Sequence, residues 1–201
     1  MSTRVILVRH GETDWTRQRR YAGFTDIDLN ETGRWQAGRL CERLHAEHID
    51  KAYSSDLKRA YTSAKIALPD LLIEKVAGLR EIKFGLFEGL TYQEAMEKHP
   101  EIYTRWIDNP RDVLIPQSEG LKKLAERVRV AIKEIVSSNK NKTVAIFTHG
   151  GPIRVILSDV AGFGLNDIWK TVQDLTGVNI IEFHDGEAQI QIQNDISHLK
   201  E

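Results

Sequence analysis

Cysteine is almost absent from this sequence. Cys41 is the single cysteine among 201 residues, so no disulfide can form within the chain. Proteins that use so little cysteine and no disulfide are typical of reducing compartments. We therefore expect a cytoplasmic protein.

Long apolar runs are also missing. The run at 5–8 contains four residues, which is too short for the core of a signal peptide. Nothing in the chain approaches the roughly 20 apolar residues that a membrane span requires. The sequence thus predicts a soluble protein without a membrane partner.

An excess of either charge is the third absence. The chain carries 28 Lys and Arg residues against 29 Asp and Glu residues, which gives a net charge of −1. Such a balance produces no global positive field that would steer the protein to nucleic acid, and we expect no nucleic-acid partner. Any anion that the protein binds must be held by local groups.

Strand-like and helix-like patterns alternate along the chain, without a linker or a repeat. The apolar runs 5–8 and 143–148 indicate buried strands, and the apolar spacing over about 30–48 and 120–138 indicates amphipathic helices. A further helix is expected to begin near Asp56. At this length, one domain over residues 1–201 is expected.

The C-terminal part of the chain is expected to form a β-hairpin with its turn at Asp185 and Gly186. Alternating strands and helices favour an α/β fold of three layers, in which helices flank a mainly parallel sheet. The hairpin would supply an antiparallel edge.

Basic side chains follow the ends of the expected strands. Arg9 and His10 come directly after the first apolar run, and His149 follows a later one. Arg59 lies near the start of a helix, where the N-terminus favours an anion. Because ligands bind beyond the carboxyl ends of parallel strands, we predict that Arg9, His10, Arg59 and His149 converge.

Other hydrolase chemistries find little support. The residue six positions after Cys41 is Glu47, so the Cys-x5-Arg loop of thiol phosphatases is absent. No Gly-rich lysine loop for nucleotide phosphates occurs. His45 and His48 have helical spacing but no evident third ligand, so we predict no metal site.

Five motifs carry a family resemblance, and they run in order from residue 4 to about 160. They read LVRHGETDW, GFTDIDLNETGRWQA, YSSDLKRAYTSA, LREIKFGLFEGLTYQEA and THGGPIRVIL. The sequence resembles the histidine phosphatase superfamily, in its phosphoglycerate-mutase-like branch. The resemblance implies a histidine phosphatase domain in which residues of about 85–120 form a helical lid over the site.

The resemblance also implies roles for individual residues. His10 becomes the nucleophile that forms a phosphohistidine, Glu81 the proton donor and acceptor, and Arg9, Arg59 and His149 the catalytic groups that grip the phosphoryl group. The implied phosphate-binding residues are Arg9, Thr16, Gly23, Arg59, His149 and Gly150. No metal and no cofactor are implied.

Elementary chemistry agrees with these roles. Phosphate monoester hydrolysis can require an acceleration approaching ~10²¹, whereas one general acid supplies on the order of 10²–10⁴. Most of the effect must come from positioning and charge, which two permanently cationic arginines provide. His10 needs its attacking nitrogen unprotonated, which a hydrogen bond from its other nitrogen to a backbone carbonyl would secure.

The sequence departs from the family pattern at two points. Thr16 stands where the family usually has Asn, and the stretch PQSEG keeps Glu119 but loses a neighbouring serine. Hydroxyl contacts to phosphate at these points are left open. So is the role of Arg17, Arg19 and Arg20, which either attract an anionic substrate or belong to a solvated loop.

The expected function is that of a phosphomonoesterase that acts on a small phosphorylated metabolite. The sequence is most similar to α-ribazole phosphatases, which makes α-ribazole 5′-phosphate the first substrate candidate. A cofactor-dependent phosphoglycerate mutase is the alternative. The resemblance implies an adjacent basic pair in this region of a mutase, whereas the stretch EIYTRWIDNP has Arg105 alone. A catalytically inactive binding protein and a homodimer are also left open.

Overall fold

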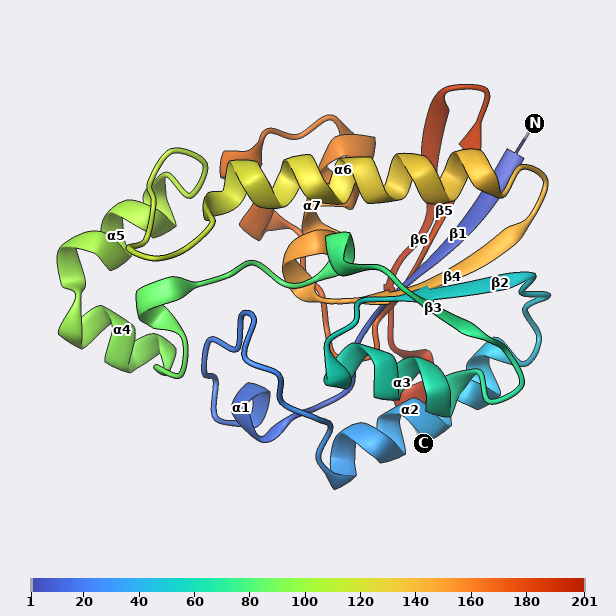
Figure 1. Cartoon of the computed structure of the whole chain (residues 1–201), viewed down its shortest axis with the longest axis horizontal. Helices are drawn as coiled ribbons and strands as arrows, with labels where there is room; N and C mark the ends of the chain where they lie inside the picture. The colour runs from blue at the N-terminus through green and yellow to red at the C-terminus, as the bar shows by residue number, and fades with distance from the viewer. Residues whose placement is uncertain (1, 201) are drawn as a thin grey trace.

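The strands of the chain form one mixed sheet. In the computed structural model, which describes residues 2–200, their order is β3-β2-β4-β1-β5-β6 (Figure 1). Strands β1, β4, β2 and β3 run parallel, whereas β5 and β6 are antiparallel at one edge. The predicted α/β fold, with a mainly parallel sheet and an antiparallel C-terminal hairpin at its edge, is confirmed.

The elements have the following bounds. The strands are β1 (Ser2–Arg9), β2 (Lys51–Ser54), β3 (Ile73–Lys75), β4 (Thr143–Thr148), β5 (Val178–His184) and β6 (Glu187–Asp195). The α-helices are α1 (Asp14–Arg17), α2 (Glu31–Leu44), α3 (Lys58–Ala67), α4 (Tyr92–Lys98), α5 (Pro100–Asp108), α6 (Gly120–Ser138) and α7 (Gly150–Ala161). The short 3₁₀ helices are η1 (Ala77–Leu79), η2 (Gly85–Phe87), η3 (Leu165–Lys170) and η4 (Ser197–Leu199).

The side chains of β1 alternate between two hydrophobic cores. Val5 and Leu7 pack in a core with residues of α6 and α7, whereas Ile6 and Val8 pack on the opposite face with residues of α2 and α3. All four side chains are completely buried. Because successive strand residues point to opposite faces, one continuous apolar run serves both cores and gives the three layers (Figure 1).

The hairpin turn lies where the sequence predicts it. Asp185 and Gly186 connect β5 to β6 with φ angles of 45° and 94°. Both values lie in the left-handed region that two-residue hairpin turns require and that Asp-Gly pairs favour.

The helix predicted to begin near Asp56 is confirmed, but Asp56, the expected cap, does not cap it. Helix α3 begins at Lys58, and Leu57 occupies the N-cap position without a side-chain hydrogen bond. The Asp56 carboxylate instead accepts a hydrogen bond from Arg80 Nε at 2.7 Å, because a guanidinium is a stronger partner than a backbone amide. Asp26 Oδ1 accepts the N–H of Lys58 at 2.7 Å, so a distant loop caps the helix that carries Arg59.

Helices α4 and α5 pack around a third, aromatic cluster. They lie beyond the carboxyl ends of the parallel strands, away from the sheet (Figure 1). The buried members of the cluster are Tyr21, Phe87, Ala95, Trp106 and Ile115. Trp106 packs in this cluster and also lines the cavity described below.

The remaining observations concern the single cysteine and the expected absence of a membrane span. The thiol of Cys41 is free and half-buried on α2. Between residues 2 and 200, the structure contains no helix that is both long and apolar enough to cross a membrane.

Candidate active site

A cavity of about 300 Å³ opens at the carboxyl ends of the parallel strands. Arg9 and His10 reach it from the end of β1, Arg59 from the first turn of α3, and Gly150 from the start of α7. Glu81 enters from the loop after η1. Of the four residues predicted to converge, Arg9, His10 and Arg59 line this cavity, and His149 lies directly behind Arg59.

The imidazole of His10 is buried and held in one orientation. Its Nδ1 lies 2.7 Å from the carbonyl oxygen of Gly11, so Nδ1–H donates and Nε2 is the unprotonated nitrogen. Burial, followed by the charges of Arg59 and Arg9, lowers the pKa of His10 well below 6.5. The ring is consequently neutral at neutral pH, with the lone pair of Nε2 free.

Arg9 contributes an unused donor to the cavity. Its Nη1 donates to the carbonyl of Gln173 at 2.6 Å, which fixes the side chain. Its Nε is buried and has no hydrogen-bond partner within residues 2–200. A buried N–H without a partner is costly, so this group is prepared for an anion.

Arg59 is fixed on three sides. Its Nε donates to His149 Nδ1 at 3.2 Å, Nη1 to the carbonyl of Thr25 at 2.9 Å, and Nη2 to the carbonyl of Gly23 at 2.7 Å. Since a guanidinium has five N–H bonds, two remain for a ligand. Burial lowers the pKa of Arg59 to about 10, which still leaves the group cationic at neutral pH.

His149 lies behind this arginine. Its Nδ1 accepts from Arg59, so Nε2–H donates to Ser55 Oγ at 2.8 Å. The ring is completely buried and lies edge-on to His10 with 5.1 Å between the ring centroids. Burial lowers the pKa of His149 well below 6.5. His149 does not line the cavity itself, but it contacts Arg59, which does.

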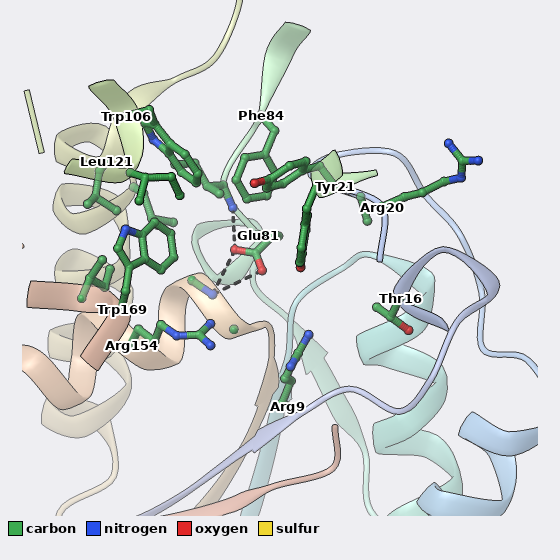
Figure 2. Close-up of a pocket in the computed structure, with 18 of the residues that line it drawn as sticks. Arg9, Thr16, Arg20, Tyr21, Glu81, Phe84, Trp106, Leu121, Arg154 and Trp169 are labelled. Atoms are coloured by element: carbon green, nitrogen blue, oxygen red, sulfur yellow. Dashed lines mark hydrogen bonds between the residues drawn. The ribbon is translucent and has the colours of Figure 1, made fainter. Parts of the chain in front are cut away.

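Glu81 is held at the N-terminus of α7. The Gly151 N–H points at both carboxylate oxygens, at 3.1 and 3.2 Å, and the Ile82 N–H donates to Oε1 at 2.9 Å (Figure 2). Donors at the start of a helix stabilise a negative charge. The carboxyl group is thus oriented toward the cavity, above Arg9 in Figure 2.

Arg127 and Glu119 support the backbone that carries Glu81. Arg127 donates to the carbonyls of Gly78, Arg80 and Glu81 at 2.7–2.9 Å and pairs with Glu119 at 2.7 Å. Glu119 also accepts the N–H of Lys83 at 2.9 Å. The acidic residue of the stretch PQSEG therefore orders the Glu81 loop and does not face the cavity.

The other predicted phosphate-binding residues differ in their placement. Thr16 lines the cavity, but its hydroxyl donates to the carbonyl of Thr13 at 2.9 Å and caps α1. Gly150 lines the cavity, whereas Gly23 lies behind it, where its carbonyl fixes Arg59.

The three arginines of the stretch TRQRRY differ in their position relative to the cavity. Arg20 lines the cavity, yet it pairs with Glu94 at 3.0 Å and points away from Glu81 (Figure 2). Arg17 pairs with Asp14, and Arg19 is exposed. These cations are occupied by local partners or lie outside the cavity.

Sequence reasoning missed Arg154 and most of the aromatic wall. The wall consists of Tyr21, Phe84, Tyr92, Tyr103, Trp106 and Trp169. Arg154 lies four residues after Gly150, and residues four apart share one face of a helix. That spacing was the available signal, whereas Trp169 reaches the cavity only through the packing of η3 on α7.

No cluster of metal-binding side chains is present within residues 2–200. No group of three or more His, Cys, Asp or Glu side chains there could hold a metal ion. His48, one of the two histidines considered for metal binding, has 97% of its side chain exposed.

The family model of the histidine phosphatase superfamily, branch 1, matches residues 5–196. The chain belongs to this family. As a histidine phosphatase it is a hydrolase, and the cavity with His10 at the end of β1 is its candidate active site.

Two curated relatives align with 98% of this histidine phosphatase. One is phosphoglycerate mutase-like protein 4 of Arabidopsis thaliana, 39% identical, with 87% of its length covered. The other is phosphoserine phosphatase 1 of Hydrogenobacter thermophilus, 34% identical, with 95% covered. Both alignments span nearly the whole of each protein.

Among solved structures, YhfR of Bacillus stearothermophilus matches with a TM-score of 0.94 and 31% identity over 98% of this chain and 100% of that one. A structure described as a putative α-ribazole-5′-P phosphatase from Escherichia coli matches with a TM-score of 0.88 over 96% of each chain. Its 24% identity shows the shared fold alone.

Proposed function

We propose that the protein hydrolyses a small phosphomonoester through a phosphohistidine at His10. The geometry of His10 carries this proposal: its Nδ1 is held by the Gly11 carbonyl, and the neutral ring lines a cavity next to two buried guanidinium groups. A nucleophile needs a free lone pair, and the charge of the phosphoryl group needs fixed cations.

The proposed reaction has two steps. His10 Nε2 attacks phosphorus, the bond to the ester oxygen breaks, and Glu81 donates a proton to the leaving alkoxide. Water then attacks the phosphohistidine, Glu81 takes a proton from that water, and the P–N bond breaks to release phosphate. The same carboxyl group serves both steps because it lies beside the leaving oxygen in the first and beside the water in the second.

The phosphoryl group is proposed to bind between Arg9 and Arg59. Arg9 offers its unpartnered Nε, and Arg59 offers the two N–H bonds that its protein partners leave free. His149 supports this grip by orienting Arg59, and Gly23 does so through its carbonyl. Thr16 and Gly150 complete the wall.

We further propose that the segment 85–120 acts as a helical lid. It contains α4 and α5, and its residues Tyr92, Tyr103 and Trp106 contribute to the cavity wall. Such a cover excludes part of the water and presents apolar surface to the organic part of the substrate.

Two substrates are candidates on separate observations. The aromatic wall suits α-ribazole 5′-phosphate, whose planar base can stack on rings. The relative named phosphoserine phosphatase, 34% identical over nearly its whole length, supports a phosphorylated amino acid. A panel of phosphomonoesters that contains both compounds compares them through kcat/KM.

Labelling of the phosphoenzyme tests the proposed chemistry. After brief incubation with a ³²P-labelled monoester, the wild-type protein should carry label that acid removes and alkali preserves. His10→Ala should carry none and turn over no substrate, because no other side chain replaces the nucleophile. His48→Ala, at an exposed histidine, is the matched control and should label like wild type. Label on His10→Ala, or label stable to acid, would contradict the proposal.

A further inference from the structure

Arg154 is a cavity arginine without an acidic partner. Its Nε donates to the carbonyl of Thr171 at 2.8 Å, and its guanidinium lies 6.0 Å from the ring centre of Trp169. Within residues 2–200, no carboxylate lies within 4.0 Å of it, in contrast to Arg20, which pairs with Glu94. Asp174 is near, but its carboxylate accepts from Asn194 at 2.7 Å.

Arg154 and Arg9 approach the same point. A Cβ built on Gly150 would lie 2.6 Å from Arg154 Nη1 and 3.7 Å from Arg9 Nε, the buried nitrogen without a partner. Figure 2 shows the two guanidinium groups approaching from opposite sides below Glu81. Because Gly150 has no side chain, both guanidinium groups lie close to the backbone at the start of α7.

Arg154 nevertheless reaches the cavity from a different element than His10. Arg154 belongs to α7 and lies against Trp169, whereas His10 follows β1. Arg9 is the cation common to both, since it lowers the pKa of each residue after burial. Arg9 is thus shared between two neighbouring positions, one at His10 and one beneath Trp169. The phosphoryl group occupies the first of these, because it must contact His10.

A count of charges indicates what the second position accepts. Arg9, Arg59 and Arg154 are three cations, and Glu81 must be protonated when it acts as the general acid. A phosphate dianion balances two of the cations. One positive charge then remains half-buried, with Asp174 as a nearby negative charge but with no carboxylate within 4.0 Å of Arg154 among residues 2–200. A buried cation without a direct partner is unfavourable.

We infer that Arg154 binds a carboxylate of the substrate, next to the phosphoryl site, and so selects phosphomonoesters of small hydroxy acids over esters without an acid group. This inference rests on the proposed function at His10. It places the carbon skeleton of the substrate over Gly150, with the carboxylate beneath Trp169. It also decides between the two substrate candidates, since α-ribazole 5′-phosphate has no carboxylate.

The test compares two esters that differ in the carboxylate alone, phosphoserine and phosphoethanolamine. A site built to bind a charged group discriminates strongly against an analogue that lacks it. The wild-type ratio of kcat/KM, phosphoserine over phosphoethanolamine, should be at least about 100. Arg154→Gln should reduce this ratio by about 100-fold, the range expected when one partner of a buried charge pair is removed.

Two further variants separate this role from others. Arg154→Lys keeps the charge without the planar fork and should give an intermediate ratio. Arg105→Gln removes an exposed arginine that does not line the cavity, and its ratio should equal that of wild type. A thermal melt of each variant identifies loss of folding.

Each outcome is decisive. An equal loss on both esters in Arg154→Gln would place Arg154 on the phosphate or in the fold and overturn the inference. A wild-type ratio near one would overturn it even if the variant fails to fold. If the wild type forms a phosphoenzyme with both esters, the function proposed for His10 survives that failure, whereas absence of a phosphoenzyme with any ester defeats the proposed function itself.

Discussion

The amide of Gly151 donates to both carboxylate oxygens of Glu81, and no side chain separates the two groups. A Cβ on Gly151 would lie 2.2 Å from Glu81 Oε1, so any larger residue must displace the carboxyl group. The glycine at the second position of α7 therefore leaves the space that the carboxyl group of Glu81 occupies.

The first prediction follows from that contact. Gly151→Ala should lower kcat by about 100-fold, since general acid catalysis contributes on the order of 10²–10⁴. Stability should be retained, because alanine favours the helix and the displaced group is a side-chain end. The matched control is Gly38→Ala in α2, where a Cβ meets nothing within 4 Å. Full kcat in Gly151→Ala would contradict the assigned position of Glu81.

A second prediction concerns the leaving group. Glu81→Gln should slow phosphoenzyme formation from alkyl phosphates far more than from p-nitrophenyl phosphate, because p-nitrophenolate departs without a proton. Rapid-quench measurement of the first turnover isolates this step from hydrolysis of the phosphoenzyme. Equal slowing for both leaving groups would remove Glu81 as the general acid.

A third prediction concerns stability against pH. The folded pKa values of His10 and His149 lie well below 6.5, so the unfolded chain binds protons that the folded chain does not. Stability should therefore fall as pH decreases below about 6.5, by roughly 1.4 kcal/mol per pH unit for each histidine. Urea unfolding of His10→Asn should show a slope smaller by about one proton, while His48→Asn should match wild type. An unchanged slope in His10→Asn would contradict the lowered pKa.

The fourth prediction is that activity persists in excess chelator. The fixed charges of Arg9 and Arg59 neutralise the phosphoryl group in the proposed mechanism, so no metal ion is needed for that purpose. Assays before and after dialysis against EDTA measure the effect. Activity that is lost in EDTA and restored by one divalent cation would refute the metal-free mechanism.

The fifth prediction is that water is the main phosphoryl acceptor. A mutase must retain its phosphoenzyme while the substrate reorients, which requires a closed site with additional cations. Arg154 is one additional cation in the cavity, but Arg105, the cation of the stretch EIYTRWIDNP, is exposed and does not supply a second. Hydrolysis of the best monoester should exceed formation of 2-phosphoglycerate from 3-phosphoglycerate primed with 2,3-bisphosphoglycerate. Isomerisation that is orders of magnitude faster would establish the mutase alternative.

Local sequence predicted the features that depend on neighbouring residues. The Asp185-Gly186 turn follows from backbone conformations that few residues adopt. The position of Arg9 and His10 at the end of a strand follows from the apolar run that stops just before them, because a buried strand leaves the core where its polar residues begin. Helix α3 shows what local sequence does not predict. The group that caps its first residue is Asp26 from another loop, whereas Asp56 pairs with Arg80.

The sequence by itself determined which groups could perform the chemistry and at which end of the sheet they gather, because strand periodicity and chain direction fix both. Only the tertiary structure decided which cations remain free for a ligand. Arg20 and Arg154 look alike in sequence, yet Glu94 neutralises the first, while the packing of Trp169 and Thr171 leaves the second facing the cavity. A charge acquires or lacks a partner through contacts between distant segments, and no local pattern encodes those contacts.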